Sequence, residues 1–220
     1  MKTVEDAKAA IEKELTSDDA EVRAEFLKRF SPEIERFAEA MAKAIVNWRS
    51  LDDGVKGDDK RAYVSAWVYT AAMLHILSMK LLLSGHLVAA GNLYRQVVET
   101  MALALVCSGK ELNVLDRFVE GKYSTNDAVN DMIRHAEKLS VNRDTVKVLE
   151  TVQKFNHKYS HPSVMTIASG MAFGNKGLYI GASFDEEKIE AYSKEVGSRR
   201  SCAEIFSNFI DGVKANVARW

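Results

Sequence analysis

Apolar residues recur with the period of an α-helix along most of the chain. Residues 4–15 and 18–30 each show an amphipathic pattern, and a third pattern with the same spacing runs from Ile34 to Trp48. Ser31-Pro32-Glu33 offers the third segment an N-cap, a proline at the first helical position and an early acid. The sequence therefore predicts separate amphipathic helices within residues 1–50.

The middle of the chain is apolar on almost every side. Residues 62–84 and 87–107 form two such segments, preceded by a solvated connection over 51–60 (LDDGVKGDDK). Each is about long enough to span a bilayer, but Lys80, Arg95 and Glu99 fall inside them, and each charge at mid-membrane costs roughly 2.5–3.5 kcal/mol. We therefore expect a central helical hairpin over 60–109 and no membrane span.

The last part of the chain changes its pattern twice. Helices are predicted over 112–120, over 125–139 and from 144 to about 161, where Pro162 follows. Residues 164–183 lose the helical period and contain four glycines, which favours a loop or a small β-hairpin turning at Asn175-Lys176-Gly177. One long or broken helix closes the chain over 185–219. The fold prediction is thus a single all-α domain, 1–220, with remaining helices and the hairpin or loop over 110–220.

Composition narrows the function classes. A net charge of −1 and a pI near 6.5 give no strong signal for nucleic acid or an anionic membrane. Cys107 and Cys202 have no metal-type or redox-type neighbours, so we expect buried thiols. The N-terminus is charged and helical and lacks the pattern of a secretory signal, which predicts a cytoplasmic protein.

A polar group interrupts the second apolar segment. Asn92, Arg95, Gln96 and Glu99 lie on adjoining parts of one helical side, and Arg95 and Glu99 stand four residues apart with opposite charges. Because the same side is apolar before and after them, we expect this pair to be at least partly buried. It is either a polar clamp between helices, a solvated strip, or part of a ligand or catalytic pocket.

The segment FNHKYSHPS has the most unusual composition in the chain. His157 and His161 share a helical face and are a weak alternative as zinc ligands, with a third ligand needed from a residue such as His135 or Glu99. The ordinary alternative is one exposed histidine and one that helps to end the helix. Since no HExxH pattern is present, we expect no metal and no cofactor. His75 is expected in the core or at a helix end.

These two polar groups are predicted to meet. Arg95 and Glu99 interrupt an apolar helix, and Tyr159 and His161 stand where Pro162 stops another helix, leaving carbonyls that need donors. We expect a shared pocket in which Glu99 orients Arg95 or accepts from Tyr159, and His161 exchanges protons. Further ligand-binding candidates are Asn92 and Asn156.

Three short motifs between residue 93 and the C-terminal helix resemble those of a known group of proteins. LYRQVVET (93–100), KYSHPS (158–163) and GLYIGASFD followed by a long helix resemble uncharacterised helical bacterial proteins associated with HEPN-like bundles, from about Ala62 to the C-terminus. In active HEPN ribonucleases an arginine and a histidine near a helix end cleave RNA. His161 matches the histidine, but Phe155 and Asn156 stand where the arginine is expected, and Lys154 is the nearest basic residue.

No complete catalytic set accompanies these residues. The chain has no GxxxxGK[ST], GxGxxG or GxSxG motif. We therefore expect a non-enzymatic interaction or oligomerisation module, most simply a homo-oligomer. Two alternatives remain open: a HEPN-like ribonuclease or other hydrolase that uses His161 with Arg95 and Glu99, and a small-ligand binder at the same pocket.

Overall fold

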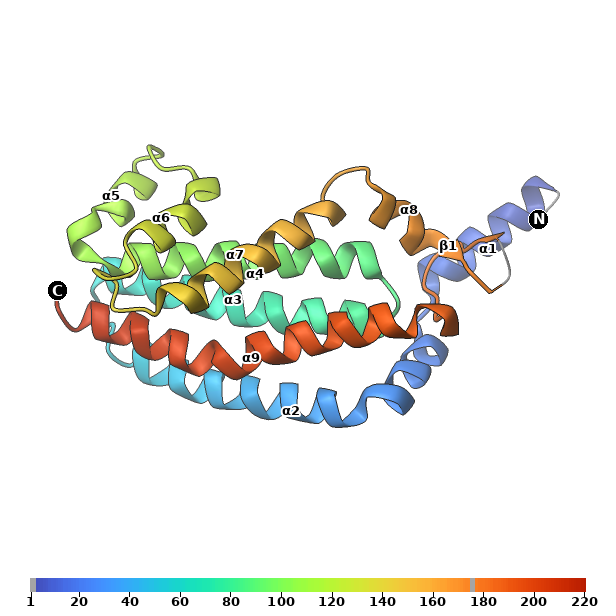
Figure 1. Cartoon of the computed structure of the whole chain (residues 1–220), viewed down its shortest axis with the longest axis horizontal. Helices are drawn as coiled ribbons and strands as arrows, with labels where there is room; N and C mark the ends of the chain where they lie inside the picture. Colours follow the sequence, from blue (N-terminus) through green and yellow to red (C-terminus); the bar gives the residue numbers. More distant parts are fainter. Residues whose placement is uncertain (1–2, 175–176) are drawn as a thin grey trace.

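The structure is a computed structural model that describes residues 3–174 and 177–220. It confirms an all-α bundle with a small β insertion (Figure 1). Four long helices lie side by side: α2 (Ala20–Asp52), α3 (Asp59–Leu83), α4 (Leu87–Ser108) and α9 (Ile189–Val217). The predicted hairpin is α3 packed on α4, and α2 packs along both α3 and α9. The first and last long helices therefore share one apolar core.

The sequence predicts that a new helix begins at residue 31, but in the structure this point is a kink inside α2. The two helices expected before and after residue 31 are therefore a single helix. Phe30 has non-helical angles (φ −124°, ψ 19°), and Pro32 lies inside the helix. Ser31 does not cap a new helix, because its hydroxyl donates to the Leu27 carbonyl at 2.6 Å. Proline removes one amide donor and crowds the carbonyl four residues earlier, which bends the helix at this point.

Short helices cover one side of α4. They are η1 (Lys110–Leu112), α5 (Val114–Val119), η2 (Thr125–Asp127), α6 (Ala128–Arg134) and α7 (Arg143–Asn156). The helix expected over 125–139 is shorter, since α6 ends at Arg134. α7 begins where the Asn142 side chain accepts from the amides of Asp144 and Thr145, as a capping asparagine does.

The segment after α7 contains a helix that was not predicted, because the glycines of residues 164–183 favoured a loop or hairpin. η3 (His157–Tyr159) is followed by α8 (Val164–Gly170), which begins in a capping box between Ser163 and Thr166. Strands β1 (Met171–Ala172) and β2 (Gly177–Leu178) then pair antiparallel, with Met171 opposite Leu178. Residues 164–170 were therefore wrongly predicted as non-helical. The predicted turn at Asn175-Lys176 lies outside the described residues.

At the N-terminus, α1 (Val4–Thr16) projects beyond the bundle near β1 (Figure 1). None of its residues is buried. A contact holds it to the loop before η4 (Glu186–Lys188): a Glu14 carboxylate oxygen accepts from the Ala182 amide at 3.2 Å. α1 is thus anchored through one face only.

The apolar core explains the composition of the hairpin helices. Both thiols, Cys107 and Cys202, are buried, as expected. Burial raises the pKa of each thiol to about 12.

By length and hydropathy, α3 is the one described helix that meets the criteria for a membrane span, and 44% of its apolar window is buried inside the protein.

Candidate functional site

Arg95 and Glu99 form an ion pair on α4. Arg95 Nε lies 2.7 Å from Glu99 Oε1, and the two side chains are about one fifth exposed. Gln153 of α7 donates to the same carboxylate oxygen at 3.0 Å. The carboxylate therefore joins α4 to α7, which is the arrangement expected of a polar clamp.

Tyr159 belongs to a different, more buried group. Its hydroxyl donates to Glu195 Oε1 of α9 at 3.0 Å, while its carbonyl accepts from Asn92 Nδ2 at 3.2 Å. Burial and the neighbouring Glu195 carboxylate raise the pKa of this phenol. Its ring fills the space over Gly91, where an added Cβ would lie 2.2 Å from Tyr159 Cδ2. Glycine at 91 thus allows η3 to approach α4.

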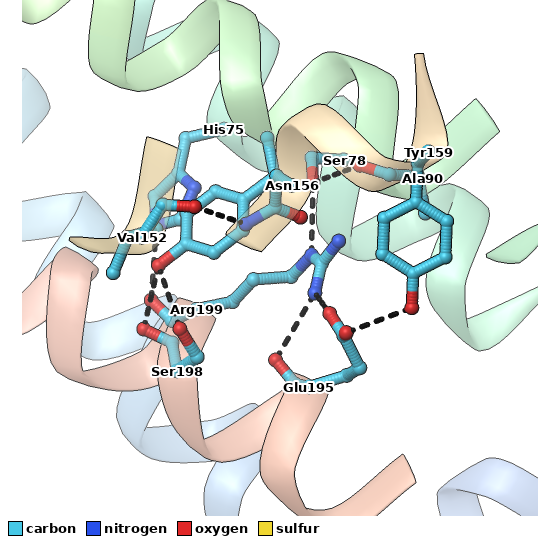
Figure 2. Close-up of polar contacts among 10 residues, drawn as sticks. His75, Ser78, Ala90, Val152, Asn156, Tyr159, Glu195, Ser198 and Arg199 are labelled. Carbon is cyan, nitrogen blue, oxygen red and sulfur yellow. Dashed lines mark hydrogen bonds and ion pairs between the residues drawn. The ribbon is translucent and has the colours of Figure 1, made fainter. Parts of the chain in front are cut away.

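A fully buried arginine stands at the centre of this group (Figure 2). Arg199 Nη1 pairs with Glu195 Oε2 at 2.6 Å, and Arg199 Nε donates to Ser78 Oγ at 2.8 Å. The guanidinium also lies over the Tyr94 ring, 4.6 Å from its centroid. Ser78 in turn donates to the Ala90 carbonyl. One cation therefore connects α3, α4 and α9, in keeping with the rule that buried charges are paired.

His75 lies against the backbone of the same arginine. Its Nε2 is 3.0 Å from the Arg199 carbonyl, and the residue is fully buried. Burial, and then the Arg199 charge, lower the pKa of this imidazole to about 3. The neutral ring therefore donates from Nε2 to the carbonyl. This is the core position that the sequence predicts for His75.

Three polar atoms in this group have no hydrogen-bond partner among the described residues, and the first is Nδ1 of His75. Asn156 is 1% exposed, and its Nδ2 donates to the Val152 carbonyl, which leaves Oδ1 free. Arg199 Nη2 also lacks an acceptor. Figure 2 shows the Asn156 amide oxygen on the side of the guanidinium. Asn156 Oδ1 needs a donor and Arg199 Nη2 needs an acceptor.

A cavity of about 640 Å³ lies between α7 with η3 and the first half of α9; Asn156 is one of its wall residues, whereas Arg199 is not. Met165 of α8 and Phe173 after β1 are among its wall residues. Lys188, 6% exposed, is another wall residue; its Nζ donates to the Ser169 carbonyl at 3.2 Å. Burial lowers the pKa of this amine. The remaining wall residues are Thr151, Val152, Phe155, Asn156, Tyr159, Glu187, Glu190, Ala191, Lys194, Glu195 and Ser198.

The structure divides the predicted site residues. Asn156 and Tyr159 line the cavity, whereas Arg95, Glu99 and His161 are not among its wall residues. His161 is exposed, and its described contact is with the His157 ring, 4.4 Å away between centroids. The hydrolase alternative therefore stays a prediction, without a shared pocket for its three residues.

The weak zinc alternative lacks a third ligand. Within residues 3–174 and 177–220, the one group of three potential ligand residues within 4.8 Å is Glu14, Asp19 and His86. Neither His157 nor His161 belongs to it. In that group, His86 Nε2 already lies 2.9 Å from Asp19 Oδ2, which ties α4 to the start of α2.

The sequence interpretation missed Arg199, Glu195 and Ser78. A signal was present, because Arg199 stands three residues after Val196 and four before Ala203, on the apolar stripe of α9. A charge at such a position must be paired inside the core. Of the two roles predicted for Glu99, the structure shows the pairing with Arg95, and the acceptor of the Tyr159 hydroxyl is Glu195 instead.

Comparison with known protein families, with curated proteins and with solved structures found no match for the chain. The HEPN-like resemblance therefore stays a prediction.

Proposed function

We propose that this protein binds a small amphipathic molecule in the cavity between α7 and α9. The observation that carries the proposal is the Asn156 amide oxygen, which has no donor although its residue lies 99% buried in the cavity wall. An unsatisfied buried acceptor costs about 1–3 kcal/mol, so a ligand that supplies the donor is favoured.

The size and lining of the cavity support this proposal. Its volume of about 640 Å³ falls within the range of about 300–1,000 Å³ that is usual for small-molecule sites. Phe155, Met165 and Phe173 give it apolar wall residues beside the polar ones. Buried ionisable groups with altered pKa values, such as Tyr159 and Lys188, are also typical of binding sites.

The partners already in place define the ligand class. The Glu195 carboxylate is occupied by Tyr159 and Arg199, so it offers no strong attraction to a cation. The free Asn156 oxygen in the cavity wall calls for a group that donates a hydrogen bond. We therefore infer an uncharged molecule with an aromatic or aliphatic body and a hydroxyl.

A titration with phenol and toluene tests the proposal, because the two molecules have the same shape and differ in the hydroxyl. Phenol should shift the amide NMR signals of α7 and the first half of α9, and bind about tenfold more tightly than toluene, the equivalent of about 1.4 kcal/mol. Equal affinity for both molecules, or no shift with either, would contradict the proposal.

A matched pair of variants locates the binding. Ala191 is an exposed wall residue, so Ala191→Trp should fill the cavity mouth, keep the fold and remove phenol binding. Ala66 is an exposed alanine of α3 outside the walls of this cavity, and Ala66→Trp should bind phenol like the wild type. Retained binding in Ala191→Trp would place the phenol elsewhere.

A further inference from the structure

α1 presents an apolar stripe to solvent. Val4 and Leu15 are 79% exposed and Ile11 is 50% exposed. Their spacing of seven and four residues places them on one face of the helix. Glu14, which binds the Ala182 amide, lies on a neighbouring face. The contact that holds α1 to its own chain therefore leaves this stripe uncovered.

A second uncovered apolar surface lies in the groove between α2 and α3. This groove has a volume of about 710 Å³. Val46 at its edge is 71% exposed, and Ile76 on the α3 side is 38% exposed. The other apolar wall residues are Ile34, Phe37, Met41, Ile45, Met79 and Leu83.

The charges of the two surfaces are opposite. The charged residues in the groove wall are Arg23, Arg49 and Lys80, and no acidic residue lines it. None of the three is in an ion pair in the described part of the chain. On the side away from its own chain, α1 carries Glu5 and Glu12 beside its stripe, together with Lys8, whose Nζ lies 3.6 Å from a Glu12 carboxylate oxygen. Carboxylates of α1 thus match the cations of the groove.

The lengths of the two surfaces also match. α1 has 13 residues and is about 20 Å long at 1.5 Å per residue. The groove runs along α2 from Ile34 to Arg49, about 22 Å on the same measure. An amphipathic helix that lays its apolar face in such a groove is a common mode of recognition.

The α1 helix of the same chain can reach only the Arg23 end of this groove. It joins α2 through residues 17–19, so if it folded back along α2 it would cover about 20 Å, roughly residues 20–33. The apolar part of the groove begins at Ile34. In the structure α1 points away from the bundle instead (Figure 1). The α1 stripe of the same chain therefore does not cover the apolar part of the groove.

We propose that α1 of one copy docks in the α2–α3 groove of a second copy, and that two copies exchange α1 reciprocally in a symmetric dimer. This inference does not depend on ligand binding in the α7–α9 cavity. It gives the predicted homo-oligomer a defined contact, in which the α1 stripe meets the groove floor and Glu5 and Glu12 face the basic rim.

Light scattering of the full chain and two variants tests the exchange. The wild type should be a dimer. Ile11→Asp breaks the stripe and Val46→Asp breaks the groove; both sites are at least half exposed in one copy, so the fold should persist by circular dichroism. Each variant alone should dimerise at least about 100-fold more weakly, the equivalent of about 2.8 kcal/mol.

Mixing the two variants separates this contact from others. A mixture retains one intact stripe and one intact groove, so it should form a heterodimer that neither variant forms alone. Two controls, Ala9→Asp on the far side of α1 and Val148→Asp at a 62% exposed position of α7, should remain dimers. A monomeric wild type, a dimeric Val46→Asp, or a mixture that stays monomeric would overturn the proposal.

Discussion

Mild acid should destabilise the protein through His75. The pKa of this buried imidazole is about 3 in the folded state, against 6.5 for a free histidine. Below pH 6.5 the unfolded chain therefore binds a proton that the native chain does not accept. Because the folded pKa is the lower one, stability is complete above pH 6.5 and falls progressively as the pH decreases toward 3.

The size of the effect follows from the two pKa values. Between pH 7.5 and pH 5 the unfolded state gains about 2 kcal/mol relative to the native state from this one group. That is a large share of the roughly 5–15 kcal/mol by which domains are usually stable. The native state has no room to relieve it, since Phe37, Tyr94 and Phe206 surround the ring and Arg199 supplies a like charge.

Urea unfolding at pH 7.5 and at pH 5, monitored by circular dichroism, measures the effect. Other groups also titrate in this range, so the informative quantity is the difference between the wild type and His75→Phe, which keeps an aromatic ring and removes the titration. The free energy of unfolding should fall with acid by about 2 kcal/mol less in His75→Phe than in the wild type. His157→Phe, at an exposed position, should keep the wild-type dependence. Identical pH dependence in all three proteins would refute the reasoning.

Four further predictions concern individual residues. Gly91→Ala should destabilise by about 1–3 kcal/mol in thermal unfolding, because the added methyl meets the tyrosine ring that ends η3. Gly197→Ala, where no atom lies within 4 Å of the added carbon, should stabilise by about 0.5–1 kcal/mol, and a loss there would contradict the explanation. Glu195→Ala should cost about 3–5 kcal/mol by leaving Arg199 buried without its carboxylate, so a neutral result would show that the pair is dispensable. His161→Ala should change stability by less than about 0.5 kcal/mol and keep phenol binding; lost binding would restore His161 to the site.

The sequence predicted the arrangement of the long helices where the apolar pattern was strong. Two apolar segments joined by Ser84-Gly85-His86 predicted the hairpin of α3 and α4, and it forms with those limits to within a few residues. The error at Ser31 has a clear cause. A serine before proline is compatible with both a helix start and a kink, and the choice depends on whether α3 and α9 provide a continuous surface for α2 to cover.

The short elements were harder to predict because tertiary contacts decide them. VMTIASG has a capping box at Ser163 but exposes Val164 and Ile167, so its apolar residues do not mark a buried face. The same is true of α1, whose apolar stripe lies in solvent. In such segments hydrophobic periodicity still indicates a helix, but the apolar face of that helix need not be buried within its own chain.

Two ion pairs with the same spacing explain why the site was only partly predicted. Arg95–Glu99 attracted attention because it interrupts an apolar segment, yet its side chains are about one fifth exposed. Glu195–Arg199 lies in a segment rich in charge, where local composition suggests a solvated face, yet the Arg199 side chain is fully buried. Which helical face is buried depends on how α3, α4 and α9 pack together. The sequence shows only that Arg199 lies in line with the apolar residues of α9. The less conspicuous pair is therefore the one that shapes the cavity, because Glu195 is both a wall residue and the acceptor that fixes Tyr159. A change that releases Arg199 should alter ligand binding and stability together, whereas a change at Arg95 should affect only the contact between α4 and α7.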